Sequence, residues 1–298
     1  MPLYIRHLPG AVSKLIDEKS LPPNLCLFNP SVAHPMMYIR QNVHSATNET
    51  NSVLLVNMDT KKQHNIPCPF HMLKKNCNTY QGIEDLRICW FRDALWFTAT
   101  STHASDSMKS EMLLGHFDKD LTRVERIMYI DLGCKPAKNV CPYVVADSLH
   151  LLDMYMMCVY KVGEIGEEQT QFVATKEKPL VYGTGLPGPN LPSKFRGSTS
   201  PVHLHGTTWG CIVHDIIFND QTVLVTQLSY LHHWIEFDVA SGVISFVSTP
   251  FWVAHWGIEY VSGVHLSDDR KGISLYLGLQ DKSAAVCHTT LANVRYGK

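Results

Sequence analysis

The sequence predicts an all-β protein, a single five-bladed β-propeller that spans residues 1–298, and three observations support this fold. Runs of β-branched and aromatic residues, bounded by turn residues, recur along the whole chain. Helical periodicity is weak outside a short opening segment, residues 11–19, which we predict to be helical. Five segments of similar form follow one another at nearly constant spacing, which indicates repeated structural units.

Each of the five segments has a polar or small-residue cluster, a strand, a turn and an aromatic-rich strand. The segments begin at Phe28, Gly82, Lys138, Arg196 and Gly257, so their starts are 54, 56, 58 and 61 residues apart. This spacing suits one four-stranded blade per segment. In order they read FNPSV with MMYIRQNV, GIEDLRICWF with ALWFTATS, KNVCPYVV with LHLLDMYMMCVY, RGSTSPVHL with TWGCIVHDIIF, and GIEYVSGVHL with GISLYLGLQD.

Outer strands are predicted between these segments, at residues 52–59, 111–118, 123–132 and 222–238. The Gly- and Pro-rich stretch at residues 181–193 is the most linker-like part of the chain. Because the repeat continues across it with little change of period, we predict a long loop between blades there rather than a boundary between domains.

The composition excludes several classes of protein. The 26 basic residues nearly balance the 27 acidic ones, so the chain lacks the cationic excess of a nucleic-acid-binding protein. The 45% hydrophobic content argues against disorder. The nine cysteines form no CxxC pair and lie mostly in apolar runs, which predicts reduced thiols. Without a visible signal peptide or an apolar run of about twenty residues, we expect a cytoplasmic protein with no membrane span.

The polar residues at the starts of the five repeats are predicted to converge. The first strand of each propeller blade lines the central axis. Buried carboxylates are costly unless they are paired or functional, so their recurrence at equivalent positions favours a functional site, whereas the alternative is a structural ion-pair network of Glu84, Asp85 and Arg87. The predicted site comprises Asn29, Glu84, Asp85, Arg87, Lys138, Asn139, Arg196, Ser198 and Glu259, with Arg40, Asp153, His214 and Asp215 from neighbouring strands.

No cofactor is predicted from the motifs. The sixteen histidines lack partners at the usual zinc-ligand spacing, so we predict no metal site, and a divalent ion is not indicated. The Asp118-Lys119-Asp120 motif falls at a predicted turn between outer strands, where we interpret it as a coincidence. Among the tryptophans, Trp256 is the best candidate for a sugar platform because it lies next to the Glu259 motif.

The ordered motifs NPSV, GIEDLRI, KNVCP, FRGSTSPV with CIVHD, YLHHWIEFD and GIEYVSGV resemble those of carbohydrate-active five-bladed propellers. These proteins include glycoside hydrolases, β-mannoside phosphorylases and related propellers found among bacterial and viral glycosyltransferases. The resemblance covers about residues 25–290 and rests on five motifs in order at blade spacing.

The resemblance implies roles for individual residues. Asp85 matches the catalytic acid of the phosphorylases, Glu259 lies near the position of the hydrolases' acid, and Glu84 is a further candidate. The implied ligands of hydroxyl groups or anions are Arg87, Arg196, His214 and His232, joined by Arg40 and Lys138. The sequence departs from the hydrolases at Asn29, where they carry an aspartate, which argues against hydrolysis by two carboxylates.

These expectations favour a glycosyltransferase that uses a nucleotide-sugar donor and a carbohydrate acceptor. Arginine binds phosphate oxygens in a bidentate manner, and lysine adds charge, so phosphate itself is an alternative partner. The alternatives are a glycoside hydrolase or phosphorylase, and a non-catalytic propeller that binds glycan or protein.

Overall fold

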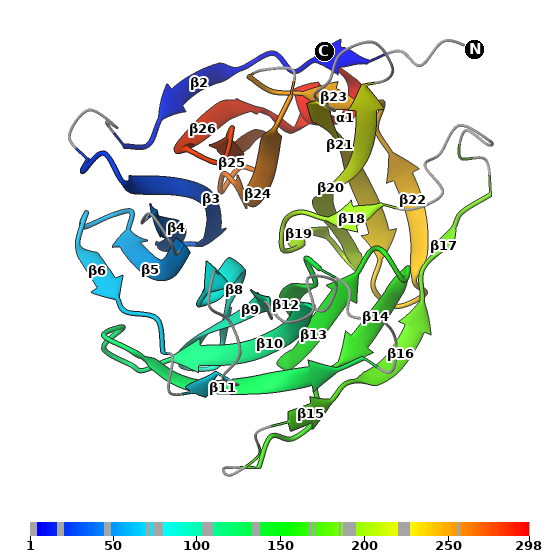
Figure 1. Ribbon diagram of the computed structural model, residues 1–298. Helices are drawn as coiled ribbons and strands as arrows, with labels where there is room; N and C mark the ends of the chain where they lie inside the picture. The colour runs from blue at the N-terminus through cyan, green and yellow to red at the C-terminus, as the bar shows by residue number, and fades with distance from the viewer. Residues whose placement is uncertain are drawn as a thin grey trace.

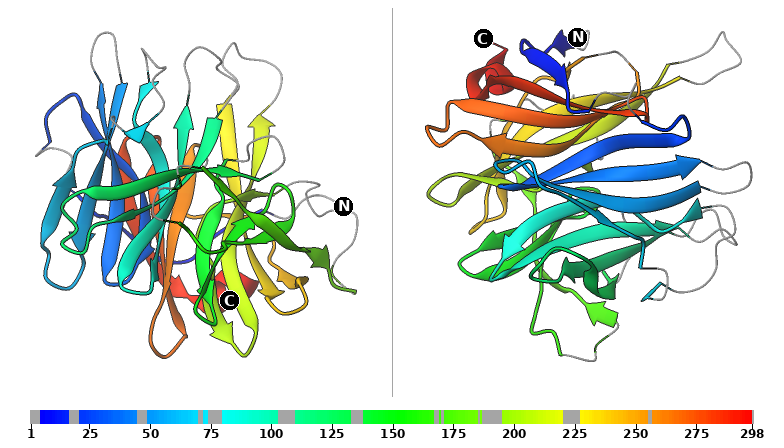
Figure 2. Two further views of the ribbon diagram at one scale, coloured as in Figure 1. Left: turned by 90° about the horizontal axis from the view of Figure 1, so that it is seen from below. Right: turned by 90° about the vertical axis from the view of Figure 1, so that its left-hand side faces the viewer.

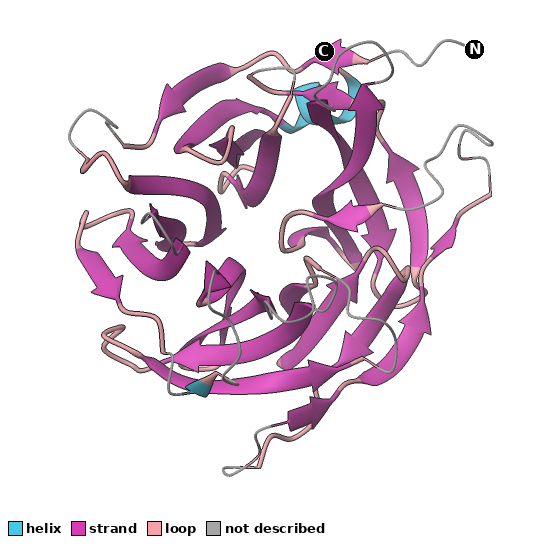
Figure 3. Cartoon of the chain, viewed as in Figure 1, coloured by secondary structure: helices cyan, strands magenta, loops and turns pink. Residues whose placement is uncertain are grey.

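The structure is a computed structural model. It describes residues 5–16, 21–44, 49–69, 72–73, 80–102, 110–132, 138–166, 169, 171–184, 186, 195–219, 227–254 and 257–297. The described strands form five sheets arranged around a central axis (Figure 1). The prediction of an all-β propeller is therefore confirmed. Strands make up most of the described chain, and helix α1 (Leu291–Tyr296) lies close to its C-terminal end (Figure 3).

The first two sheets contain the predicted segments that start at Phe28 and Gly82. The first sheet has β3 (Leu25–Ala33), β4 (Met36–His44), β5 (Glu49–Asn57), β6 (Gln63–Ile66) and β7 (Tyr80–Gln81), which pairs with β5. The second has β8 (Ile83–Phe91), β9 (Ala94–Thr102), β10 (Ser110–Phe117), β11 (Val124–Asp131) and β15 (Gln171–Val173).

The next two sheets contain the segments that start at Lys138 and Arg196. The third sheet has β12 (Cys141–Val145), β13 (Ser148–Asp153), β14 (Cys158–Lys161) and β16 (Thr175–Pro179). The fourth has β18 (Arg196–Gly197), β19 (Val202–His205), β20 (Thr208–Asn219), β21 (Gln227–Asp238), β22 (Val243–Val247) and β23 (Phe251–Trp252), extended by β17 (Val181–Tyr182) and β1 (Arg6–His7).

The fifth sheet joins the two ends of the described chain. It has β24 (Glu259–Leu266), β25 (Gly272–Leu279) and β26 (Ser283–Thr290), with β2 (Ala11–Lys14) pairing antiparallel to β26. Because β2 precedes β3 in sequence but belongs to the fifth sheet, backbone hydrogen bonds link the first part of the chain to the last. Each of the five predicted segments thus lies in a different sheet.

Two predictions about local structure are wrong. The opening segment at residues 11–19 was expected to be helical, but Ala11–Lys14 forms β2, because pairing with the edge of β26 satisfies its backbone. Residues 17–19 lie outside the described residues. The predicted strand at residues 149–160 is a hairpin of β13 and β14. The Asp153 carboxylate accepts hydrogen bonds from the amides of Tyr155 and Met156 and so stabilises the turn between them.

The sheets also depart from the predicted four strands each. The third and fifth sheets have four strands, but the others have five, five and eight. Short strands from adjoining parts of the chain, such as β15 and β17, add to outer strands of neighbouring sheets.

The described cysteines are free thiols, as predicted; Cys77 and Cys134 lie outside the described residues. No helix among the described residues is long and apolar enough to cross a membrane.

Hydrophobic side chains fill the junctions between neighbouring sheets, which lie next to one another in the edge-on views (Figure 2). Each cluster combines residues from two adjacent sheets, for example Tyr38 with Phe97, Leu114 with Leu151, Leu152 with Phe237, Trp234 with Leu275, and Leu27 with Val286. Both faces of an inner sheet are therefore buried, which explains the nearly continuous apolar runs of its strands. This packing holds β3, β8, β12, β18 and β24 around the axis.

Candidate active site at the propeller axis

A cavity of about 450 Å³ opens where the inner strands meet. Its lining comes from the first, second, fourth and fifth sheets, from the segment just before β12 and from the β25–β26 turn. It consists of Phe28, Asn29, Arg40, Asn42, Asp85, Lys138, Asn139, Arg196, His214, Tyr230, Tyr260 and Asp281. We call it the axial cavity. Seven of these residues were predicted from the sequence: Asn29, Arg40, Asp85, Lys138, Asn139, Arg196 and His214. The predicted convergence of the repeat starts is thus seen in the structure.

Three residues of the cavity adopt a left-handed backbone, two of them on the inner strands β3 and β8 and one just before β12. Asn29, Asp85 and Asn139 have φ angles of 49°, 51° and 65°. The strand pairing shifts register at Asn29 and at Asp85, so both lie in β-bulges. Asparagine and aspartate tolerate this conformation better than most residues, and bulges redirect side chains next to active sites. The bulged inner strands therefore present polar groups to the axis.

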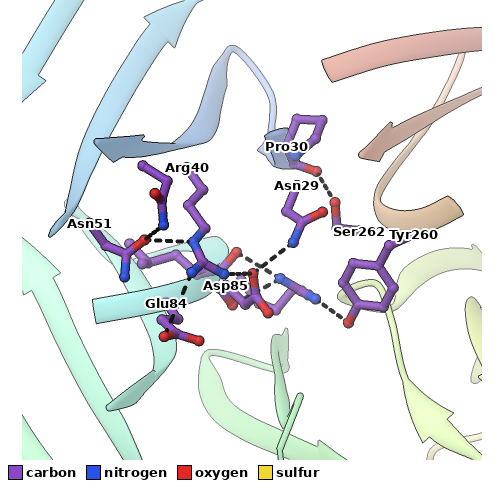
Figure 4. A network of polar contacts seen from close by, with 11 residues as sticks. Asn29, Pro30, Arg40, Asn51, Glu84, Asp85, Tyr260 and Ser262 are labelled. Atoms are coloured by element: carbon purple, nitrogen blue, oxygen red, sulfur yellow. Dashed lines mark hydrogen bonds and ion pairs between the residues drawn. The ribbon is translucent and has the colours of Figure 1, made fainter. Parts of the chain in front are cut away.

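Asp85 lies at the centre of a hydrogen-bonded network (Figure 4). Its Oδ1 accepts a hydrogen bond of 2.9 Å from Asn29 Nδ2 and one of 3.2 Å from Arg40 Nη1. The guanidinium of Arg40 also donates to Asn51 Oδ1 at 2.8 Å and lies 3.6 Å from a carboxylate oxygen of Glu84. Asn29 fits here because residue 278 is glycine, where a Cβ would lie 2.1 Å from Asn29 Oδ1.

The two carboxylates of the axial cavity have pKa values shifted in opposite directions. Burial would raise the pKa of Asp85, but the charges of Arg40 and Arg87 and the hydrogen bonds from Asn29 and Arg40 outweigh it and lower the pKa. Desolvation by surrounding protein atoms raises the pKa of Asp281, and the negative charge of Asp85 raises it further. Opposite shifts in one site are typical of an acid and base with different roles.

His214 contributes a neutral imidazole to the cavity. Burial lowers its pKa well below the ordinary value, and the neighbouring His232 imidazole and the positive charges of Arg196 and Arg87 lower it further. Its Nδ1 lies 2.7 Å from the hydroxyl of Ser198. When the hydroxyl donates this bond, Nε2 carries the proton and His214 can donate it to a ligand. Ser198 is fully buried, so it orients the imidazole and does not line the cavity.

Several predicted site residues instead support the architecture. Arg87 is fully buried beside the cavity, where it donates to carbonyl oxygens and to the Tyr260 hydroxyl. Glu84 pairs with Arg40 but does not line the cavity. Asp153 is buried and caps the β13–β14 turn. Asp215 follows His214 in a strand, so its side chain points to the opposite face.

Glu259 and His232 form part of the packing between the fourth and fifth sheets. Glu259 is fully buried and accepts hydrogen bonds of 2.6 and 2.5 Å from the amides of Val253 and Ala254. His232 is also fully buried, and its Nε2 accepts a hydrogen bond from the amide of Val261. Neither lines the axial cavity, so a catalytic Glu259 and a ligand-binding His232 are not supported. Trp256 lies outside the described residues.

Replacing Glu259 with glutamine is expected to lower stability without changing chemistry in the axial cavity. The amide of glutamine keeps one acceptor but turns a donor toward the Val253 or Ala254 amide, which costs about 1–3 kcal/mol. Urea unfolding of the Glu259→Gln variant measures this loss, with the exposed Glu125→Gln as the matched control. If the variant instead had the stability of the wild type but had lost enzymatic activity, Glu259 would be a catalytic residue.

Sequence reasoning missed Phe28, Asn42, Tyr230, Tyr260 and Asp281 as cavity residues. Asp281 closes the fifth predicted segment, GISLYLGLQD, and has a φ angle of 52° in the β25–β26 turn. Tyr230 lies on β21, and its ring is 5.3 Å from that of His214.

Among the described residues, no cluster of histidine, cysteine, aspartate or glutamate is arranged to hold a metal ion. Asp118 hydrogen-bonds Thr122 within the predicted turn.

Comparison with known proteins finds similarity in structure alone. No protein-family model matches the sequence, and no curated protein matches it. A GDP-Man-dependent mannosyltransferase from Leishmania mexicana, MPT-1, superposes with a TM-score of 0.59 at 12% identity, covering 91% of each chain. MPT-4, a mannose phosphorylase from the same organism in complex with phosphate, gives 0.56 at 14% identity, covering 92% of this chain and 89% of the other.

A GH43_1 enzyme from Xanthomonas citri complexed with xylose gives a TM-score of 0.55 at 11% identity, covering 95% of this chain and 91% of the other. These neighbours are carbohydrate-active propellers, which agrees with the resemblance seen in the sequence motifs. The chain therefore shares its fold with propeller hydrolases, phosphorylases and a mannosyltransferase.

Proposed function

We propose that this protein is a glycosyltransferase that moves a sugar from a nucleotide-sugar donor to a glycan acceptor in the axial cavity. The observation that carries this proposal is the distribution of charge around the cavity. Arg40 is neutralised by Glu84 and Asp85, whereas Lys138 and Arg196 take part in no ion pair among the described residues. Two such cations beside one cavity favour an anionic group such as the diphosphate of a donor.

The neutral groups beside these cations suit the same ligand. His214 is held as a neutral donor, and the half-buried Tyr230 packs against it. A hydrogen bond from the imidazole to a phosphate oxygen adds directionality to the charges of Lys138 and Arg196. The sugar would then lie toward Asn29 and Asp85, whose amide and carboxylate oxygens suit its hydroxyl groups.

The chemistry needs one proton acceptor and one charge stabiliser. The acceptor hydroxyl loses its proton to a carboxylate while its oxygen bonds to the anomeric carbon, and the bond from that carbon to the diphosphate breaks with its electrons going to the leaving group. Asp281 has the raised pKa that suits a proton acceptor. Asp85 remains ionised beside Arg40 and suits stabilisation of positive charge at the anomeric carbon.

A phosphorylase is the second candidate, because Asp85 and Asp281 provide two carboxylates in one cavity with opposite pKa shifts. In that reaction inorganic phosphate would occupy the cationic side and a carboxylic acid would protonate the leaving sugar. Hydrolysis is less well supported, since Asn29 replaces the expected aspartate and Glu259 is buried outside the cavity.

Titration with nucleotides and phosphate tests the proposal. We expect GDP, UDP and their sugar conjugates to raise the thermal unfolding temperature, and the Lys138→Ala/Arg196→Ala variant to bind the best of them at least about tenfold more weakly, since each charge-assisted hydrogen bond is worth about 1.5–3 kcal/mol. The exposed Lys62→Ala is the control. Stabilisation by phosphate but by no nucleotide would favour the phosphorylase, and stabilisation by neither would contradict both.

A further inference from the structure

A second cavity lies between the second and third sheets, at the other end of β8 from Asp85. Its volume is about 620 Å³, larger than that of the axial cavity. It is lined by Phe91 and by residues on β9, β10, β13 and β14 and in the loop after β14. Asp85 and Phe91 are six positions apart on one strand. At about 3.3 Å per residue, the two cavities are therefore about 20 Å apart, too far for one small ligand to fill both.

Aromatic rings form one wall of this second cavity. The centroid of the Trp96 indole lies 4.7 Å from that of the His116 imidazole and 5.9 Å from that of the Phe91 ring. Trp96 remains partly exposed, whereas Phe91 is buried. An indole fixed by two neighbouring rings presents a rigid apolar surface with little entropy left to lose when a ligand binds.

The rim carries charged groups of both signs. Among the exposed side chains, Arg92 and Lys161 contribute positive charges, and Asp147 and Glu164 contribute negative ones; the partly buried Arg126 is a third cation of the lining. None of the four takes part in an ion pair within the part of the chain that the structure describes. These side chains are therefore not committed to one another, although they surround the same cavity.

The protein backbone keeps the rim in place. Asp147 has a φ angle of 58° in the tight turn between β12 and β13, next to Ala146 at 45°. Arg126 donates hydrogen bonds of 2.5 and 2.7 Å to the carbonyl oxygens of Gly166 and Gln169 and thereby holds the loop that carries Glu164. Both carboxylates are thus held at the cavity by the local fold.

We propose that this second cavity binds a neutral oligosaccharide, separately from the reaction in the axial cavity. Two carboxylates lie among the cations of this cavity, so its lining does not select one sign of charge, which suits a neutral ligand. Sugar hydroxyl groups both donate and accept hydrogen bonds, so carboxylates and cations can serve the same ligand. The apolar C–H face of a sugar ring matches the partly exposed indole of Trp96.

The test is a titration with mannose- and xylose-containing oligosaccharides, followed by the indole NMR signals. We expect the Trp96 signal, assigned by its loss in Trp96→Phe, to shift on titration. The Asp147→Ala/Glu164→Ala variant should bind at least about fivefold more weakly, because it removes two exposed acceptors without touching the core. The Lys138→Ala/Arg196→Ala variant should bind as the wild type does, which separates this site from the proposed function. Trp90→Phe, a change of an exposed tryptophan on β8 outside both cavities, is the control.

Two outcomes would overturn this proposal. The first is a Trp96 signal that no oligosaccharide shifts, and the second is binding that the Asp147→Ala/Glu164→Ala variant retains unchanged. A shift produced by inorganic pyrophosphate but by no neutral sugar would also overturn it, since the site would then select anions. Failure of nucleotide binding at the axis would leave these results unaffected.

Discussion

Replacing Asp85 with asparagine is expected to lower the rate of glycosyl transfer by about 10²–10³-fold, the usual cost of removing one group that stabilises charge in the transition state. The substitution keeps the shape of the side chain but removes its charge. Asn29 Nδ2 and Arg40 Nη1 both donate to Oδ1, which the new amide retains, so the substitution tests the charge with these two hydrogen bonds in place. The measurement is release of nucleoside diphosphate from whichever donor binds best to the wild type.

The control for Asp85→Asn is Asp93→Asn, the same change at the exposed turn after β8. Donor affinity should change much less than the rate, because Lys138 and Arg196 remain in place. If the rate falls less than tenfold while the donor still binds, Asp85 would be part of the architecture of the axis and the non-catalytic interpretation would gain. The Asp281→Asn variant then tests whether Asp281 is the proton acceptor. Removing this carboxylate should slow transfer most at pH values above its pKa, where the wild-type side chain is ionised.

The repeat was readable in the sequence because each strand begins with polar residues and continues into apolar ones. Five starts at spacings of 54 to 61 residues correctly assigned one segment to each sheet. The strands β2 and β15 could not be predicted in this way. They pair with distant parts of the chain, and their short sequences carry no pattern of their own.

The site was predicted well where the inner strands begin and poorly elsewhere. Asn29, Asp85 and Asn139 belong to the repeated motif; bulges turn Asn29 and Asp85 toward the axis, and Asn139 lies just before β12 with a left-handed backbone. Asp281 lines the same cavity from the β25–β26 turn and Tyr230 lines it from β21. Neither lies at the start of a repeat, so the repeated motif did not predict them. Glu259 lies at the start of the fifth repeat, as the motif predicted, but it is buried outside the cavity and accepts hydrogen bonds from backbone amides.

The structural alternative for the axis was an ion-pair network of Glu84, Asp85 and Arg87. Glu84 and Asp85 do form ion pairs, but with Arg40, whereas Arg87 hydrogen-bonds uncharged groups. Arg87 is fully buried, its Nε donates to the Ser198 carbonyl, and its Nη1 donates to the carbonyls of Asp85 and Leu86 at 2.8 and 3.2 Å. Its Nη2 donates to the Tyr260 hydroxyl. One side chain therefore ties the second sheet to the fourth and fifth and also lowers the pKa of Asp85.

The Arg87→Met variant is expected to lose about 3–5 kcal/mol of unfolding free energy, the cost of removing one partner from a buried charged network. Methionine fills much of the volume but leaves the Ser198 and Asp85 carbonyls and the Tyr260 hydroxyl without this donor. Urea unfolding at neutral pH gives the measurement, and Arg123→Met, at a side chain that is 72% exposed, should change stability by less than about 0.5 kcal/mol. A loss of under about 1 kcal/mol for Arg87→Met would show that water or relaxation replaces its bonds. The hydrophobic junctions between neighbouring sheets would then be the contacts that hold the inner strands together around the axis.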